Sequence, residues 1–133
     1  MRPLARTLAD PALAGVGAVA AADVPTVIAA AGEAGLATIT VLPAGGKAAL
    51  LAALAEALDF PSWYGHNWDA LLDCLSDLSW SRARGHVVML EASETLAAAH
   101  PAVFATLLEV GAEAAQRQAQ AGYPLWLLLV TDR

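Results

Sequence analysis

Three short apolar runs, each separated from the next by helix-like sequence, constrain the fold more than any other feature of the chain. The runs are LATITVL (36–42), HVVMLE (86–91) and PLWLLLV (124–130). β-Branched and large apolar residues at this length are typical of strands. The last run is apolar throughout, as expected for a strand buried on both faces. Because helical segments join the strands, the sequence predicts an α/β domain with a small parallel sheet and right-handed crossovers.

The segments between these runs carry helical periodicity and helix-terminal residues. Residues 47–58 place four leucines on one apolar stripe. Asn67 is a candidate N-cap for a helix that continues to about Asp77. A short helix is expected from about residue 94 to 100, and Pro101 then begins the longest helix. The sheet is therefore expected to have three strands packed with helices.

Residues 1–34 precede this pattern and are interpreted as an N-terminal extension of a single domain spanning 1–133. GVGAVA (15–20) is a weak candidate for a fourth strand. Asp23 and Pro25 then predict the start of a helix that ends before Gly35. The extension is therefore expected to add a strand and a helix at the edge of the sheet.

Several features favour a cytoplasmic protein. Arg2 and Arg6 precede a weakly apolar segment that superficially resembles a signal peptide, but Asp10 and Pro11 interrupt it. No apolar run approaches the length of about 20 residues that a membrane-spanning helix needs. The single cysteine, Cys74, excludes an internal disulfide and is compatible with a reducing compartment.

The net charge of −6 is concentrated in one part of the chain. Residues 48–81 contain five acidic residues and no Lys or Arg. A surface with this charge repels nucleic acid and attracts basic partners. We therefore expect a basic protein partner and no nucleic-acid or membrane partner.

The most informative stretch is WYGHNWDALLDCL (63–75). Helical periodicity places Asp69 and Asp73 one turn apart on one face, which is expected to face outward together with Ser76. Like charges at this spacing destabilise a helix by roughly 0.2–0.5 kcal/mol. The helix dipole favours Asp69 in the first turn by about 0.3–1 kcal/mol but does less for Asp73. The opposite, buried stripe is expected to consist of Trp68, Leu71, Leu72 and Leu75.

This pattern alone leaves several interpretations open. The two carboxylates are compatible with a solvated acidic face, with a metal site that includes His66, or with an acid/base pair. No phosphate-binding loop, nucleophile motif or cofactor fingerprint supports an enzyme. Trp63 and Tyr64 are compatible with core residues or with binding anchors. Gly65 is expected to adopt a backbone turn that is closed to other residues.

The segment FPSWYGHNWDALLDCL (60–75) resembles the barstar family, whose type member is the intracellular inhibitor of the ribonuclease barnase. The aromatic-Tyr-Gly, Asn and Asp-Ala-Leu pattern is matched at fixed spacing, and the order of strands and helices fits over roughly residues 36–131. The resemblance implies a barstar-like fold. It also implies an inhibitor that catalyses nothing, holds no cofactor or metal, and is a monomer when free.

The resemblance further implies which residues bind the partner, a basic secreted ribonuclease or related nuclease toxin against which the protein confers immunity. Trp63 and Gly65 become loop contacts, Asp69 and Asp73 become anionic contacts, and Asp73 takes the place of a substrate phosphate. The complete set of expected partner-binding residues is Trp63, Tyr64, Gly65, His66, Asn67, Asp69, Leu72 and Asp73.

The sequence also departs from the family pattern. Arg117 occupies the position of a contact Glu in the last helix, and Glu113 lies one turn earlier. Leu72 stands where the type inhibitor has Trp, His66 replaces an acid, and the connection at 76–86 is longer. A barstar-fold binding module with a non-nuclease partner is therefore the alternative function.

Overall fold

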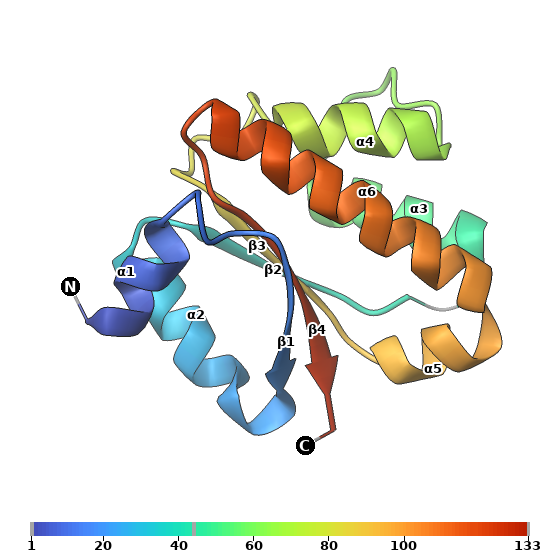
Figure 1. Ribbon diagram of the computed structural model, residues 1–133. Helices are drawn as coiled ribbons and strands as arrows, with labels where there is room; N and C mark the ends of the chain where they lie inside the picture. Colours follow the sequence, from blue (N-terminus) through green and yellow to red (C-terminus); the bar gives the residue numbers. More distant parts are fainter. Residues whose placement is uncertain (1, 44, 133) are drawn as a thin grey trace.

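The computed structural model describes residues 2–43 and 45–132 and contains one parallel sheet (Figure 1). Its strands are β1 (Val16–Ala20), β2 (Ala37–Val41), β3 (His86–Leu90) and β4 (Leu125–Thr131). Their spatial order is β1-β4-β3-β2, and every pairing is parallel. The predicted α/β class is confirmed, and the weak strand candidate is the fourth strand, at the edge beside β4.

Helices cover both faces of this sheet. Figure 1 shows α1 and α2 on one side and α3, α4, α5 and α6 on the other. None of the described helices is long and apolar enough to cross a membrane. The helices are α1 (Pro3–Ala9), α2 (Val24–Glu33), α3 (Lys47–Ala57), α4 (Trp68–Asp77), α5 (Ser93–Ala99) and α6 (Pro101–Gln120), and a short 3-10 helix occupies Ala21–Asp23.

The two central strands explain why the apolar runs are continuous. All five residues of β3 are buried. Val88 and Leu90 belong to the core beneath α3, α4 and α6, whereas Val87 and Met89 belong to the core beneath α1 and α2. Because side chains alternate between faces, a strand covered on both sides needs apolar residues at every position.

Helix α1 is a feature that the sequence analysis missed. Ala5 and Leu8 on this helix are buried in the second core. Two contacts hold the segment in place: Trp126 Nε1 donates to Leu8 O at 2.9 Å, and Arg2 pairs with Glu33 at 3.0 Å. Residues 2–34 therefore form the layer that covers one face of the sheet, and they also supply its edge strand β1.

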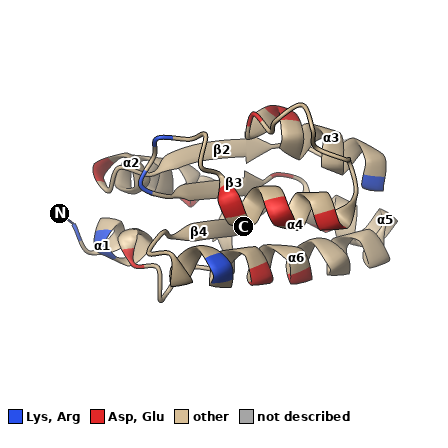
Figure 2. Ribbon diagram, turned by 90° about the horizontal axis from the view of Figure 1, so that it is seen from above, with Lys and Arg blue, Asp and Glu red and all other residues tan. Residues whose placement is uncertain are grey.

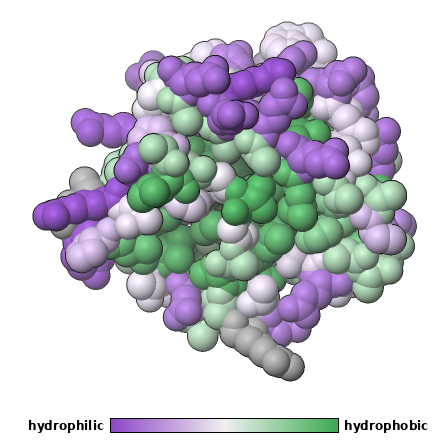
Figure 3. Space-filling model, in the orientation of Figure 1, coloured by the Kyte–Doolittle hydropathy of each residue, from purple (hydrophilic) through white to green (hydrophobic). Residues whose placement is uncertain are grey.

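Polar and apolar surfaces are segregated around this framework. In Figure 3, hydrophilic residues gather where α4 lies, and apolar residues extend across the middle of the view, over β1 and the adjoining part of the sheet. On the opposite side of the sheet from α1 and α2, α4 packs alongside α6. This packing leaves the loop at 58–67 and one face of α4 on the surface.

Candidate functional site

The start of α4 is fixed by the side chain of Asn67, as the sequence predicted. Asn67 Oδ1 accepts a hydrogen bond from the Ala70 amide at 2.8 Å, which is an N-cap interaction. Asn67 Nδ2 donates to Gly65 O at 3.3 Å. The cap ties the loop to the helix, so the direction of α4 and the position of the loop are set together.

Between Trp63 and Asn67 the left-handed residue is His66 rather than Gly65, which corrects the expectation for the glycine. His66 has φ +52°, a conformation that costs a non-glycine residue roughly 1–2 kcal/mol. Its ring lies 4.6 Å from the Tyr64 ring. At Gly65 a Cβ atom would stand 3.0 Å from Asn67 Nδ2, so the missing side chain allows the capping amide to approach the backbone.

The loop rests on a base of aromatic side chains. Phe60 lies 4.9 Å from Tyr64 and 6.0 Å from Trp80, both in edge-to-face geometry, and Trp80 Nε1 donates to Leu58 O at 3.0 Å. Such pairs are worth about 0.5–1.5 kcal/mol beyond the area that they bury. The base gives the loop a defined shape in the free protein.

Trp63 and Tyr64 are neighbours in sequence but have opposite environments. The Trp63 side chain is 63% exposed at the tip of the loop, whereas Tyr64 is 5% exposed and belongs to the core. Burial raises the pKa of Tyr64 to about 12, and the nearby Cys74 adds to the effect. Tyr64 was expected among the contact residues; the structure places its side chain in the core, where its ring packs against Phe60 and His66.

Helix α4 presents its carboxylates on one exposed face. Asp69, Asp73 and Asp77 are exposed, and none of them forms an ion pair within the described chain. Of the expected buried stripe, Leu71 and Leu75 are buried, whereas Trp68 and Leu72 are half-buried at the border of the face. Leu72 therefore remains accessible beside Asp69 and Asp73.

The prediction that Ser76 faces outward is wrong. Its Oγ is buried and has no hydrogen-bond partner among the described residues. The reason is that α6 packs against this end of α4, where Gln118 Nε2 donates to Leu75 O at 2.9 Å. The exposed acidic face is thus narrower than helical periodicity alone indicates.

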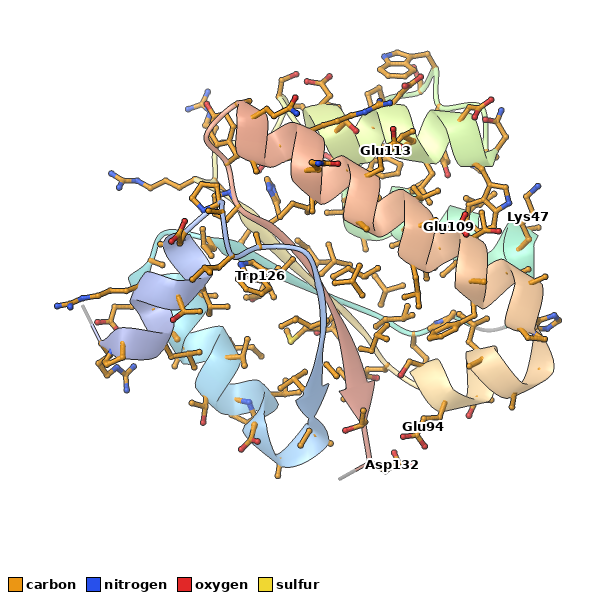
Figure 4. The ribbon with its side chains drawn as sticks, viewed as in Figure 1. Lys47, Glu94, Glu109, Glu113, Trp126 and Asp132 are labelled. Carbon is orange, nitrogen blue, oxygen red and sulfur yellow. The ribbon has the colours of Figure 1, made fainter. Side chains whose placement is uncertain are left out.

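Helix α6 extends the acidic surface. Figure 2 shows the acidic residues of α4 and α6 side by side on the face seen from above, and Figure 4 shows Glu109 and Glu113 along α6. Arg117 Nη2 lies 2.9 Å from Glu113 Oε1, so this cation is paired within its own helix. The Glu that lies one turn before Arg117 in the sequence is therefore its ion-pair partner in the structure.

A second cation, Lys47, lies beside this surface, and the sequence analysis did not place it there. Lys47 Nζ is 5.6 Å from the centre of the Trp68 ring, which is within cation–π range. The two residues are 21 positions apart in the chain, so no local pattern connects them. The contact joins the first turn of α3 to the first turn of α4.

Two kinds of chemistry that were considered for this surface, a metal site and a reactive thiol, are tested by the geometry. Within the described residues, no three His, Cys, Asp or Glu side chains form a group that could hold a metal ion, so His66, Asp69 and Asp73 form no such group. Cys74 is fully buried. Burial raises the pKa of its thiol, and Asp73 and Asp77 add to that shift, so the thiol is a poor nucleophile.

A family model described as Barstar (barnase inhibitor) matches residues 36–130. The chain belongs to the barstar family. The match includes the aromatic base, the loop and α4, and it leaves out α1, β1 and α2. No curated protein sequence matches the chain. The resemblance inferred from the sequence is confirmed, and the family is one of inhibitors rather than enzymes.

Proposed function

We propose that this barstar-family protein inhibits a basic microbial ribonuclease or a related nuclease toxin by inserting α4 and the preceding loop into the active site of the nuclease. It acts in the cytoplasm as an immunity protein and uses no cofactor. The observation that carries the proposal is the pair Asp69 and Asp73, exposed and unpaired beside the exposed Trp63.

The electrostatics of the free protein support this role. Two like charges one turn apart destabilise the helix by roughly 0.2–0.5 kcal/mol, and the described chain supplies no ion-pair partner that offsets the repulsion. A ribonuclease binds the phosphates of RNA, so its active site is cationic. Carboxylates on α4 are complementary to such a site, and complementary charge raises the association rate and selects the partner.

The construction of the loop also supports binding. The Asn67 cap and the aromatic base under Tyr64 hold the loop in one shape before any partner arrives. A preorganised surface loses less conformational entropy on association. Exposed tryptophans near the centre of an interface are frequent binding hot spots, and Trp63 is the aromatic residue in this position.

The Glu113–Arg117 ion pair favours one alternative, a barstar-fold module that binds a protein other than a nuclease. It places a cation on α6 next to the acidic face. A partner with a uniformly basic surface gains nothing from Arg117. A partner that carries an acidic side chain opposite α6 fits this mixed surface better.

Inhibition of RNA cleavage tests the proposal directly. The protein is mixed with a panel of microbial ribonucleases, and the inhibition constant is measured for the wild type and for Asp73→Asn. Loss of one member of a buried charge pair costs about 2–5 kcal/mol, so we expect the constant to rise by about 30-fold or more. Asp23→Asn, on the opposite face of the sheet, is the matched control and is expected to leave inhibition unchanged, since Asp23 makes no capping hydrogen bond.

The proposal fails if no nuclease is inhibited or if Asp73→Asn inhibits as well as the wild type. Affinity capture from the native cell distinguishes the nuclease inhibitor from the alternative binding module. A main partner that is not a nuclease, retained by the wild type and lost with Asp73→Asn, supports the binding module. A nuclease retained in the same way supports inhibition.

A further inference from the structure

A concave feature lies at the end of α4 that is opposite the loop. It is a cleft of about 500 Å³, enclosed by the end of α4, the connection to β3, the start of β3 and the end of α6. Figure 1 shows the connection after α4 close to the C-terminal end of α6. The volume lies within the range of about 300–1,000 Å³ that is usual for small-molecule sites.

The lining of this cleft has the opposite charge from the face of α4. Arg82 and Arg84 both line it, and Asp77 is the one acid among its lining residues. Neither arginine forms an ion pair within the described chain. The cleft therefore carries excess positive charge in a protein whose net charge is −6.

The backbone contacts place Arg84 in the cleft wall. Its amide donates to Gly35 O at 3.1 Å. A Cβ atom at Gly35 would stand 3.1 Å from Arg84 Cδ, so the stem of the arginine lies directly over the glycine. The stem of Arg84 thus packs against the turn that precedes β2, and the residue as a whole is exposed.

Unused hydrogen-bonding groups lie in the same lining. His86 is buried, and its Nε2 lies 2.7 Å from Ser81 Oγ, which also accepts from the Ala83 amide at 3.3 Å. In the arrangement where the Ser81 hydroxyl donates to Nε2, His86 Nδ1 carries a proton that no described residue accepts. Ser76 Oγ is also buried, with no hydrogen-bond partner in the part of the chain that the structure describes. Buried polar groups of this kind are normally satisfied by protein, water or ligand.

The ends of the neighbouring helices do not account for the arginines. Gln118 Nε2 donates to Leu75 O at 2.9 Å and to Asp77 O at 3.2 Å, which satisfies carbonyls at the end of α4. At the end of α6, the Tyr123 amide donates to Gln118 O at 2.9 Å. Cations near helix C-termini are often explained as caps, but here other groups already bond to these carbonyls.

We propose that this cleft binds a small phosphate monoester. Arg82 and Arg84 contact the phosphate oxygens, since guanidinium groups match phosphate in geometry and charge. His86 supplies a further hydrogen-bonding group through the ring nitrogen that Ser81 does not contact. The half-exposed ring of Tyr123 at the rim accommodates the apolar or planar remainder of the ligand. The site is separate from the loop and does not depend on the proposed nuclease partner.

An NMR titration tests this site with inorganic phosphate and phenyl phosphate as probes, at constant ionic strength and with chloride as the reference anion. We expect saturable amide shifts confined to residues 76–86 and 118–123, and tighter binding of phenyl phosphate. Arg82→Gln and Arg84→Gln are each expected to weaken binding about tenfold, the usual effect of losing one charge-assisted hydrogen bond. Arg6→Gln, an equal change of charge on α1, is expected to leave the affinity unchanged.

The site is refuted if the shifts do not saturate, if they spread over the surface, or if Arg6→Gln weakens binding as much as the cleft variants. Arg82 makes no hydrogen bond or ion pair within the described chain, so its replacement tests binding without disturbing the fold. Ribonuclease inhibition by Arg82→Gln is measured in parallel. Because the two surfaces are separate, failure of either proposal leaves the other standing.

Discussion

Replacing Gly85 with alanine is expected to destabilise the protein strongly, although the change adds a single methyl group. Gly85 is buried just before β3. A Cβ atom at this position would stand 2.5 Å from Pro124 O and 2.6 Å from Pro124 Cγ. The same oxygen accepts the His86 amide at 3.0 Å, in the first bond between β3 and the segment leading into β4. The clash therefore falls on the backbone at the point where the central strands begin to pair.

The magnitude follows from three terms. Overpacking in a well-packed interior costs about 1–3 kcal/mol, and loss of the His86 amide hydrogen bond adds about 0.5–1.5 kcal/mol. Alanine restricts the unfolded chain more than glycine does, and this effect raises the free energy of unfolding by about 0.4–1 kcal/mol. The expected net loss in the free energy of unfolding is about 0.5–4 kcal/mol, with a central value of about 2 kcal/mol.

Urea unfolding followed by circular dichroism measures this loss, with Gly32→Ala as the matched control. Gly32 lies inside α2, and a Cβ atom there would meet nothing within 4 Å. Alanine is favoured over glycine in a helix by about 1 kcal/mol, so Gly32→Ala is expected to stabilise the protein. The reasoning is refuted if Gly85→Ala matches the wild type, or if both substitutions shift the midpoint in the same direction.

Three further predictions concern stability. Ala92 is exposed with φ +51°, so Ala92→Gly is expected to raise the free energy of unfolding by about 0.5–1 kcal/mol. The control Ala98→Gly, inside α5, is expected to lower it by about 1 kcal/mol. Equal effects of the two substitutions in urea unfolding contradict this prediction. Tyr64→Phe removes a buried hydroxyl that has no described partner. It is expected to raise the free energy of unfolding by about 1 kcal/mol, seen as a higher urea midpoint. A lower midpoint means that the hydroxyl is hydrogen-bonded in the native protein. Burial lowers the pKa of His86 from 6.5, so the unfolded chain binds the proton more readily, and stability is expected to fall as pH drops from about 6.5 through the folded pKa. His86→Gln is expected to flatten that pH profile, and an unchanged profile excludes His86 as the cause.

Much of the fold and part of the site were predictable because they depend on neighbouring residues. The apolar patterns predicted β2, β3 and β4 and the helices between them. The Asn67 cap and the paired exposure of Asp69 and Asp73 follow from helix geometry within about seven residues. The fixed spacing of residues 60–75 was also sufficient for the family to be inferred, and the match over residues 36–130 confirms it.

Other features depend on contacts between residues far apart in the chain, and these only the tertiary structure decided. Trp63 and Tyr64 are adjacent aromatic residues with the same possible roles on sequence grounds. In the structure, Tyr64 is buried against the other aromatic rings, whereas Trp63 is exposed. Ser76 lies on the polar side of its helix by periodicity, but its hydroxyl is buried at the end of α4 that packs against α6.

The order of strands in the sheet and the cleft at the end of α4 also depend on contacts between residues far apart in the chain. The pairing of β1 with β4 joins residues more than 100 positions apart, so local sequence could indicate a strand but not its partner. The cleft brings Asp77, Arg84 and Tyr123 together from three segments. Local sequence specifies which elements form and which faces are apolar, because those depend on periods of two and about four residues. Packing among distant elements then determines which side chains remain at the surface to bind another molecule.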